Sequence, residues 1–192
     1  TETAREVFAL FQQYDGELSV FCNGLAIKTP EGIAKLTSRT AHFLSSEARQ
    51  NLTDGRFTVI PGIESWMSRH AHEIEKLCMF FDSIEKTAAA LPGFQAIPGV
   101  EVVQGSPDNI EVTAAGVDKG EALRALADRL DVPHECTLAV GDSENDRAML
   151  QKAGVAAVMA NGMPEIRALA HLVSKADCDH DGVAEIFARL GL

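Results

Sequence analysis

The last third of the chain alternates short apolar runs with stretches in which apolar residues recur at helical spacing. Residues 119–130 predict a helix with one apolar face, formed by Ala122, Leu123, Leu126, Ala127 and Leu130. Apolar runs at 137–140, 155–159 and 172–173 predict strands, and helical patterns follow at 146–153, 165–170 and 183–190. Gly154 is expected to close the second of these helices in the left-handed conformation. Such strand–helix repeats are typical of a parallel sheet covered by helices on both faces.

The earlier part of the chain lacks this regular alternation. Its pattern predicts a helix at 4–13, a buried strand at 18–22 that ends at Asn23-Gly24, and a continuation at 25–27. Farther along, it predicts helices at 33–52, 63–76 and 83–91, the last ended by Pro92-Gly93, and strands at 57–60, 77–81, 94–97, 100–104 and 110–113. Residues 30–108 therefore resemble a small α+β module.

Composition narrows the possible partners and the compartment. The 192 residues carry a formal net charge of −11 and a pI near 4.9, which argues against nucleic acid or an anionic membrane as a partner. The four cysteines are widely spaced and form no CxxC pair, which favours reduced thiols in a cytoplasmic protein. No apolar run is as long as a membrane span.

Oxygen-bearing side chains gather directly after the predicted strand 137–140. Asp142, Glu144, Asn145 and Asp146 follow Gly141 within five residues. Ligands bind at the loops that leave the carboxyl ends of parallel strands, and clustered carboxylates repel one another unless a cation lies among them. Oxygen ligands select Mg²⁺ or Ca²⁺. The alternative is a solvated turn whose Asp residues cap a helix.

Lys119 and two Asn-Gly pairs are candidates for the same edge of the sheet. A lysine in the first turn of a helix opposes the helix dipole, which indicates an anion such as phosphate held there. The alternative is a surface lysine. Asn23-Gly24 and Asn161-Gly162 each follow a predicted strand. Each pair has a simpler explanation as a left-handed turn.

Two segments carry a resemblance to a known family. Residues 118–123 (Asp-Lys-Gly-Glu-Ala-Leu) and 141–150 (Gly-Asp-Ser-Glu-Asn-Asp-Arg-Ala-Met-Leu) resemble the last two motifs of the haloacid dehalogenase superfamily, closest to its Cof-type sugar phosphatases. Weaker matches lie at 21–27, 158–162 and 181–184, so that residues 4–190 follow the pattern in order.

The resemblance implies an α/β fold with a Rossmann-like parallel sheet. This core would consist of residues 1–29 and 109–192, lacking its N-terminal strands, and residues 30–108 would form an inserted α+β cap that reads the substrate. The implied activity is a Mg²⁺-dependent phosphatase of small phosphorylated metabolites that works through an aspartyl-phosphate. Lys119 would steady the phosphate and the phosphoryl intermediate, and Asn23, Gly24 and Asn161 would contact the substrate or its phosphate. Asp142 would hold Mg²⁺, with Asn145 and Asp146 as further ligands or as residues that orient the ligands.

One expected motif is absent from the printed sequence. The family's nucleophile lies in an Asp-x-Asp-Gly-Thr string on the first strand, which precedes the helix that opens this chain. Residues 179–183 (Asp-His-Asp-Gly-Val) are similar but follow no apolar strand and occupy the place of the family's terminal Asp-Gly-Val-Ala string. We therefore expect an inactive chain whose nucleophile lies upstream, or a non-catalytic relative that keeps a phosphate and Mg²⁺ pocket. The unpaired sheet edge left by the missing strand predicts self-association.

Overall fold

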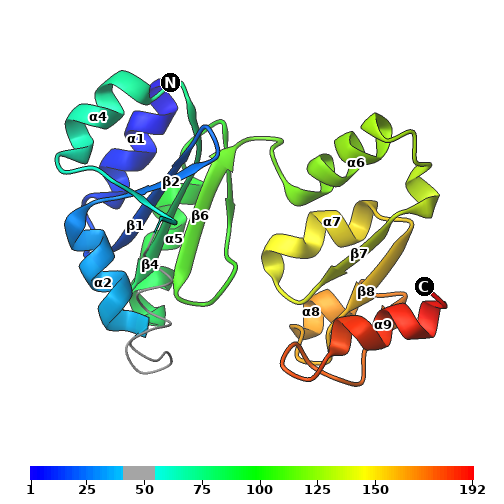
Figure 1. Cartoon of the computed structure of the whole chain (residues 1–192). Coiled ribbons are helices and arrows are strands. Elements are labelled where there is room, and N and C mark those ends of the chain that lie inside the picture. Colours follow the sequence, from blue (N-terminus) through cyan, green and yellow to red (C-terminus); the bar gives the residue numbers. More distant parts are fainter. Residues whose placement is uncertain (41–54) are drawn as a thin grey trace. The chain divides into compact units, whose positions relative to one another are not determined.

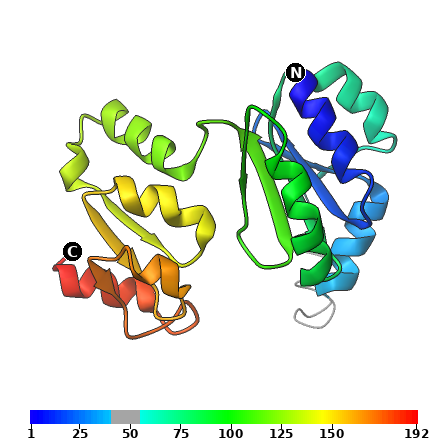
Figure 2. The ribbon, with the colours of Figure 1, turned by 180° about the vertical axis from the view of Figure 1, so that it is seen from behind.

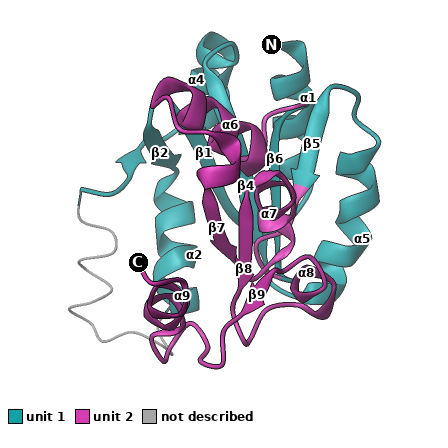
Figure 3. Cartoon of the chain, turned by 90° about the vertical axis from the view of Figure 1, so that its right-hand side faces the viewer, with its two compact units in different colours: residues 1–102, 107–115 teal, residues 103–106, 116–192 magenta. Residues whose placement is uncertain are grey.

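The computed structural model describes residues 1–40 and 55–192, and it divides the chain into two compact units. Unit 1 contains residues 1–102 and 107–115, and unit 2 contains residues 103–106 and 116–192 (Figure 3). Within the described residues, no helix is long and apolar enough to cross a membrane.

Unit 1 is an α+β unit built on a six-stranded sheet with the order β3-β2-β1-β4-β6-β5. Its strands are β1 (Gly16–Cys22), β2 (Leu25–Lys28), β3 (Thr58–Val59), β4 (Ile74–Phe81), β5 (Val100–Val103) and β6 (Asn109–Ala114). Its helices are α1 (Glu2–Phe11), α2 (Pro30–Thr40), α4 (Ile63–His70) and α5 (Ile84–Gln95). β4 pairs antiparallel with both β1 and β6, so the sheet is mainly antiparallel.

One face of this sheet carries the hydrophobic core of unit 1. Alternate residues of the central strands, such as Val20, Leu77 and Ile110, pack against apolar residues of α1, α4 and α5. Figure 2 shows α1 and α5 lying across that face. Phe11 of α1 and Phe94 of α5 are both fully buried, with ring centres 4.2 Å apart.

The opposite face is polar and holds a buried ion pair. The ammonium of Lys28 lies 2.6 Å from Glu17 Oε1 and 2.5 Å from Ser19 Oγ, and Lys28 and Glu17 are only 1% and 5% exposed. Arg39 of α2 donates from Nε to Glu17 Oε2 at 3.0 Å. A buried charge is tolerated only with such partners, so Glu17 fixes both cations.

Unit 2 is a three-layer α/β/α arrangement around a parallel sheet with the order β7-β8-β9. Its strands are β7 (Leu138–Gly141), β8 (Val155–Val158) and β9 (Leu172–Val173). Its α-helices are α6 (Lys119–Arg129), α7 (Arg147–Lys152), α8 (Pro164–Arg167) and α9 (Gly182–Leu190), and its 3₁₀ turns are η1 (His134–Cys136) and η2 (Glu144–Asp146). Ala156 and Val158 face Leu150 and Ile166, whereas Ala157 faces Ile186 of α9. Figure 1 shows α7 and α9 on opposite sides of β7 and β8, which confirms the predicted sheet covered on both faces.

The structure corrects the expected domain boundaries. The sequence predicts that residues 1–29 belong to the parallel core and residues 30–108 to the cap, yet α1, β1 and β2 belong to unit 1. The reason is pairing, because β1 runs antiparallel to β4 from Gly16↔Phe81 to Cys22↔Ile74. β6 also joins this sheet, so unit 1 extends to Ala115.

Several predicted elements of unit 1 differ from those observed. The helix expected at 63–76 ends at His70, and Ile74 begins strand β4. The strand expected at 94–97 is absent, because α5 continues through Pro92 to Gln95. The first part of the helix expected at 33–52 lies in α2, and its remainder from residue 41 onward lies outside the described residues.

Gly154 is required for close packing rather than for a left-handed turn. It is not among the glycines with positive φ. A Cβ atom at this position would lie less than 3.0 Å from the backbone of Glu135. The expected left-handed helix end is therefore wrong, and the glycine instead lets the segment before β8 pass against η1.

Gly154→Ala should lower the free energy of unfolding of unit 2 by about 1.5 kcal/mol, because the added methyl group forces a backbone shift. Chemical denaturation followed by circular dichroism measures this. Gly93→Ala is the matched control, since its Cβ would meet only Leu10 at an ordinary 3.6 Å within a helix. Equal behaviour of the two variants would contradict the packing described for Gly154.

Candidate functional site

The loop that leaves β7 is built around the carboxylate of Asp146. β7 ends at Gly141, Ser143 begins the turn η2, and Asp146 closes it. Ser143 and Asp146 form a reciprocal capping box, in which each side chain accepts a hydrogen bond from the other residue's backbone N–H. A Cβ atom on Gly141 would lie less than 3.0 Å from the Asp146 side chain, so only glycine allows this carboxylate to fold back over the strand end.

Asp146 bonds to the ammonium of Lys119 from the neighbouring helix. Its Oδ1 lies 2.6 Å from Lys119 Nζ, and its Oδ2 accepts from the backbone N–H groups of Asp142 at 3.0 Å and Ser143 at 3.4 Å. The Asp146 side chain is 8% exposed, whereas that of Lys119 is 50% exposed. The buried carboxylate thus fixes the loop and positions the ammonium of Lys119, which remains accessible to solvent.

Lys119 opens α6, which packs closely on α7. A Cβ atom on Gly120 would lie less than 3.0 Å from the carbonyl oxygen of Ala148. Asp118 is the N-cap, accepts a hydrogen bond from the N–H of Glu121 at 2.7 Å, and pairs with Lys152 at 3.1 Å. Partial burial raises the pKa of Asp118, but these hydrogen bonds outweigh it and hold that pKa below its usual value. The cap therefore stays ionised and fixes the helix end that carries Lys119.

Asn161 brings the loop after β8 to the same place. Its Nδ2 donates to Asp142 Oδ2 at 3.4 Å, and its Oδ1 accepts from the N–H of Cys178 at 3.1 Å. The N–H of Met163 donates to the carbonyl oxygen of Asp142 at 2.9 Å. The structure thus brings together Lys119, Asp142, Asp146 and Asn161 from three loops of unit 2.

Asn145 is half-buried beside this group, and its Oδ1 accepts from Ser143 Oγ at 3.0 Å. Asn23 and Gly24 belong to unit 1. Both have positive φ, 51° and 73°, and they form the turn between β1 and β2. This hairpin accounts for the pair without a ligand, as the alternative explanation stated. The expectation that it follows a strand of the parallel sheet is wrong, because β1 belongs to the antiparallel sheet.

The chemistry of the donor set decides how a Mg²⁺ ion fits this site. Both oxygens of Asp146 already accept hydrogen bonds, whereas in the described part of the chain Oδ1 of Asp142 accepts none. No group of three or more His, Cys, Asp or Glu residues that could hold a metal occurs among the described residues. Mg²⁺ is usually bound through one or two carboxylates, waters and substrate phosphate. Asp142 fits that mode, and Asp146 instead orients Lys119.

Two residues of the site escaped the sequence analysis. Ser143 holds Asp146 and Asn145, and its spacing three residues before Asp146 is the capping-box signal that could have found it. Lys152 bridges Asp118 and Glu121 at 3.1 and 2.8 Å. A lysine in the last turn of a helix is ordinary, so Lys152 gave no signal.

Comparison with known proteins shows the family and the fold of this chain. Residues 1–187 match the sequence profile of the family of haloacid dehalogenase-like hydrolases. Phosphatase YwpJ of Bacillus subtilis is 35% identical over 106 residues, which cover 55% of this chain and 37% of the relative. The solved structure of a haloacid dehalogenase-like hydrolase from B. subtilis matches with a TM-score of 0.78 at 24% sequence identity. The match covers 98% of this chain and 70% of the chain of that protein.

A further solved structure is a sugar phosphatase of haloacid dehalogenase subclass IIB. It has a TM-score of 0.70 at 19% identity, and the match covers 99% of this chain and 66% of that protein. At these identities the two structures show a shared fold. The chain spans well under half of YwpJ and about two thirds of the solved relatives.

Proposed function

Because the chain belongs to the family of haloacid dehalogenase-like hydrolases, we propose that it carries the lysine and metal site of a Mg²⁺-dependent phosphatase. Its substrates in this proposal are phosphoric monoesters of small metabolites, such as sugar phosphates. The supporting observation is the cluster in which buried Asp146 holds Lys119 beside the open carboxylate of Asp142. The proposal places the protein in the cytoplasm, where its four free cysteines stay reduced.

Lys119 is the residue that binds the phosphate in this proposal. One N–H of its ammonium donates a hydrogen bond to Asp146, which leaves two N–H donors for phosphate oxygens. The first-turn N–H groups of α6 lie at the same helix end and favour negative charge. Because Asp146 and the ionised Asp118 fix this helix end, Lys119 needs little reorganisation to bind.

Asp142 is the proposed ligand of Mg²⁺, with Asn145 and Asn161 beside it. When bound, the ion would neutralise the repulsion between a carboxylate nucleophile and the phosphate. The chain's own part is to hold Asp142: Asn161 donates to its carboxylate, and the N–H of Met163 donates to its backbone carbonyl oxygen.

The nucleophile in this proposal is an aspartate outside the 192 residues, and the product of its attack is an aspartyl-phosphate. Asp179 and Asp181 do not suit this role, because both are exposed in the loop before α9 and follow no buried strand of the sheet. β7 has no second neighbour in the described sheet. The segment with the nucleophile would pair there, and a chain without it would self-associate.

The alternative function is a non-catalytic module that binds phosphate and Mg²⁺.

Expressing the chain with and without the coding segment upstream of Thr1 tests the proposal. The extended protein should hydrolyse a panel of sugar phosphates with Mg²⁺ and elute as a monomer. Lys119→Ala should lower its kcat at least about a hundredfold, whereas Lys175→Ala, an exposed lysine of unit 2, should not. Turnover by the 192-residue chain would contradict the placement of the nucleophile. An upstream segment without Asp-x-Asp-Gly-Thr would favour the non-catalytic alternative.

A further inference from the structure

Unit 1 contains a cavity of about 550 Å³ that the phosphatase proposal does not use. All eleven residues that line it belong to unit 1. They come from α2, the start of β1, the end of β4, the first turn of α5 and the loop before β6. The volume lies within the range of small-molecule sites.

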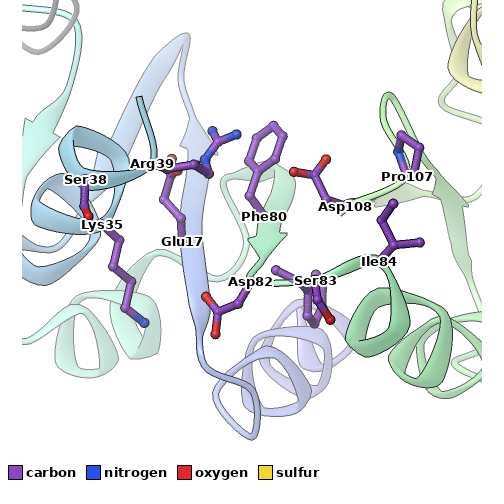
Figure 4. A pocket seen from close by; sticks show the side chains of 11 residues that line it. Glu17, Lys35, Ser38, Arg39, Phe80, Asp82, Ser83, Ile84, Pro107 and Asp108 are labelled. Atoms are coloured by element: carbon purple, nitrogen blue, oxygen red, sulfur yellow. The ribbon is translucent and has the colours of Figure 1, made fainter. Parts of the chain in front are cut away.

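The cationic lining of this cavity consists of Lys35, which pairs with Asp15, and of Arg39, which is fixed in position. Arg39 donates from Nε to Glu17 Oε2 at 3.0 Å, and its guanidinium carbon lies 4.0 Å from the centre of the Phe80 ring. Figure 4 shows Arg39 beside Phe80 and Glu17. Glu17 is itself held by buried Lys28. Across the described residues, the Nη groups of Arg39 donate no hydrogen bond, so two parallel donors are pre-organised for a planar two-oxygen acceptor.

Two aspartates in loops, Asp82 and Asp108, give the cavity negative charge. Asp82 follows β4, and its Oδ2 lies 2.8 Å from Lys86, while Oδ1 accepts nothing in the part of the chain that the structure describes. Asp108 lies in the loop before β6, and Figure 4 places it across Phe80 from Arg39. Carboxylates in these positions accept hydrogen bonds from an ammonium and repel an anion that carries two charges.

Apolar side chains complete the lining. Phe80 lies between Arg39 and Asp108 (Figure 4). Ile84 is 56% exposed in the first turn of α5 and lines the cavity together with Pro107. An isoleucine left this exposed at the mouth of a cavity is available to cover an apolar group of a ligand.

We propose that this cavity binds a free α-amino acid with an apolar side chain. The carboxylate of the ligand bonds to the two Nη groups of Arg39, its ammonium bonds to Asp82 and Asp108, and its side chain packs on Phe80, Ile84 and Pro107. A phosphate would meet the two aspartates, and a neutral ligand would leave the arginine fork without an acceptor. All of the residues that line this site belong to unit 1, and the argument for it uses none of the residues of the proposed phosphatase site.

Titration of the ¹⁵N-labelled full chain with L-leucine tests the proposal. We expect saturable shifts at the amides of Arg39, Asp82 and Ile84. Leucinamide lacks the carboxylate and 4-methylpentanoate lacks the ammonium, and each should bind at least about tenfold more weakly. Inorganic phosphate should not compete. Equal binding of either half-ligand, competition by phosphate, or no binding of leucine, methionine or phenylalanine at about 10 mM would overturn the proposal.

Variants separate the site from general folding effects. Arg39→Gln should remove leucine binding, and Arg39→Lys should not restore it, because an ammonium lacks the planar fork. Asp82→Asn should weaken binding without touching the Arg39–Glu17 pair. Arg69→Gln, an arginine on α4 bonded to Ser65, is the matched control and should bind leucine normally. Unchanged binding by both Arg39→Gln and Asp82→Asn would refute the site.

Discussion

Replacing Glu17 by Gln should lower the free energy of unfolding of unit 1 by about 3 kcal/mol. The substitution keeps the shape of the side chain and removes its charge. Lys28 is 1% exposed, so its ammonium would stay buried opposite a neutral amide. Burying an uncompensated charge is strongly unfavourable, whereas a partly exposed partner such as Arg39 can turn toward water.

The single tryptophan makes this effect measurable in unit 1 alone. Trp66 lies in α4 and packs against the unit 1 core, so its fluorescence during urea unfolding follows that unit. The double variant Glu17→Gln/Lys28→Met removes both charges of the buried pair and should recover most of the lost stability. A single variant as stable as the double would mean that Lys28 is not confined to the buried position seen in the structure.

Asp146→Ala should destabilise unit 2 by about 3 kcal/mol, because its carboxylate accepts from two backbone N–H groups and from Lys119. Removing it leaves the N–H groups of Asp142 and Ser143 without their acceptor. Lys119 also loses the group that positions it.

Hydrogen exchange of strand amides such as Val140 and Ala156 measures this change within unit 2. Asn145→Ala is the matched control in the same turn, since its side chain oxygen accepts only from Ser143 Oγ among the described residues. That variant should cost less than about 1 kcal/mol. Equal losses of protection in the two variants would show that Asp146 is merely one more polar residue of the turn.

The fold of unit 2 was predictable because its signals are local. Each strand is followed within a few residues by the helix that covers it, and β8 is apolar on both sides because both faces are covered. The acidic loop and Lys119 were likewise found from their places after a strand and at a helix start. What the sequence did not reveal is that Asp146 orients the lysine, because this depends on how closely α6 approaches α7.

Unit 1 was harder to predict because its organisation depends on distant contacts. β1 alternates Leu18, Val20 and Cys22 toward the core with Glu17, Ser19 and Phe21 on the other face. Its partner β4 lies about fifty residues away, so periodicity could not identify the pairing. Pro92 predicted a helix end, yet α5 continues because Phe94 is fully buried against Phe11. Burial of that ring outweighed the local signal.

Titration of the ¹⁵N-labelled chain with inorganic phosphate in the presence of Mg²⁺ tests most directly whether unit 2 holds a phosphate site. We expect shifts at Lys119, Gly120, Asp142, Ser143 and Asn161, which Lys119→Ala removes and Lys175→Ala leaves unchanged. Absence of these shifts, or shifts that persist in Lys119→Ala, would contradict the proposed role of the Lys119–Asp146–Asp142 cluster.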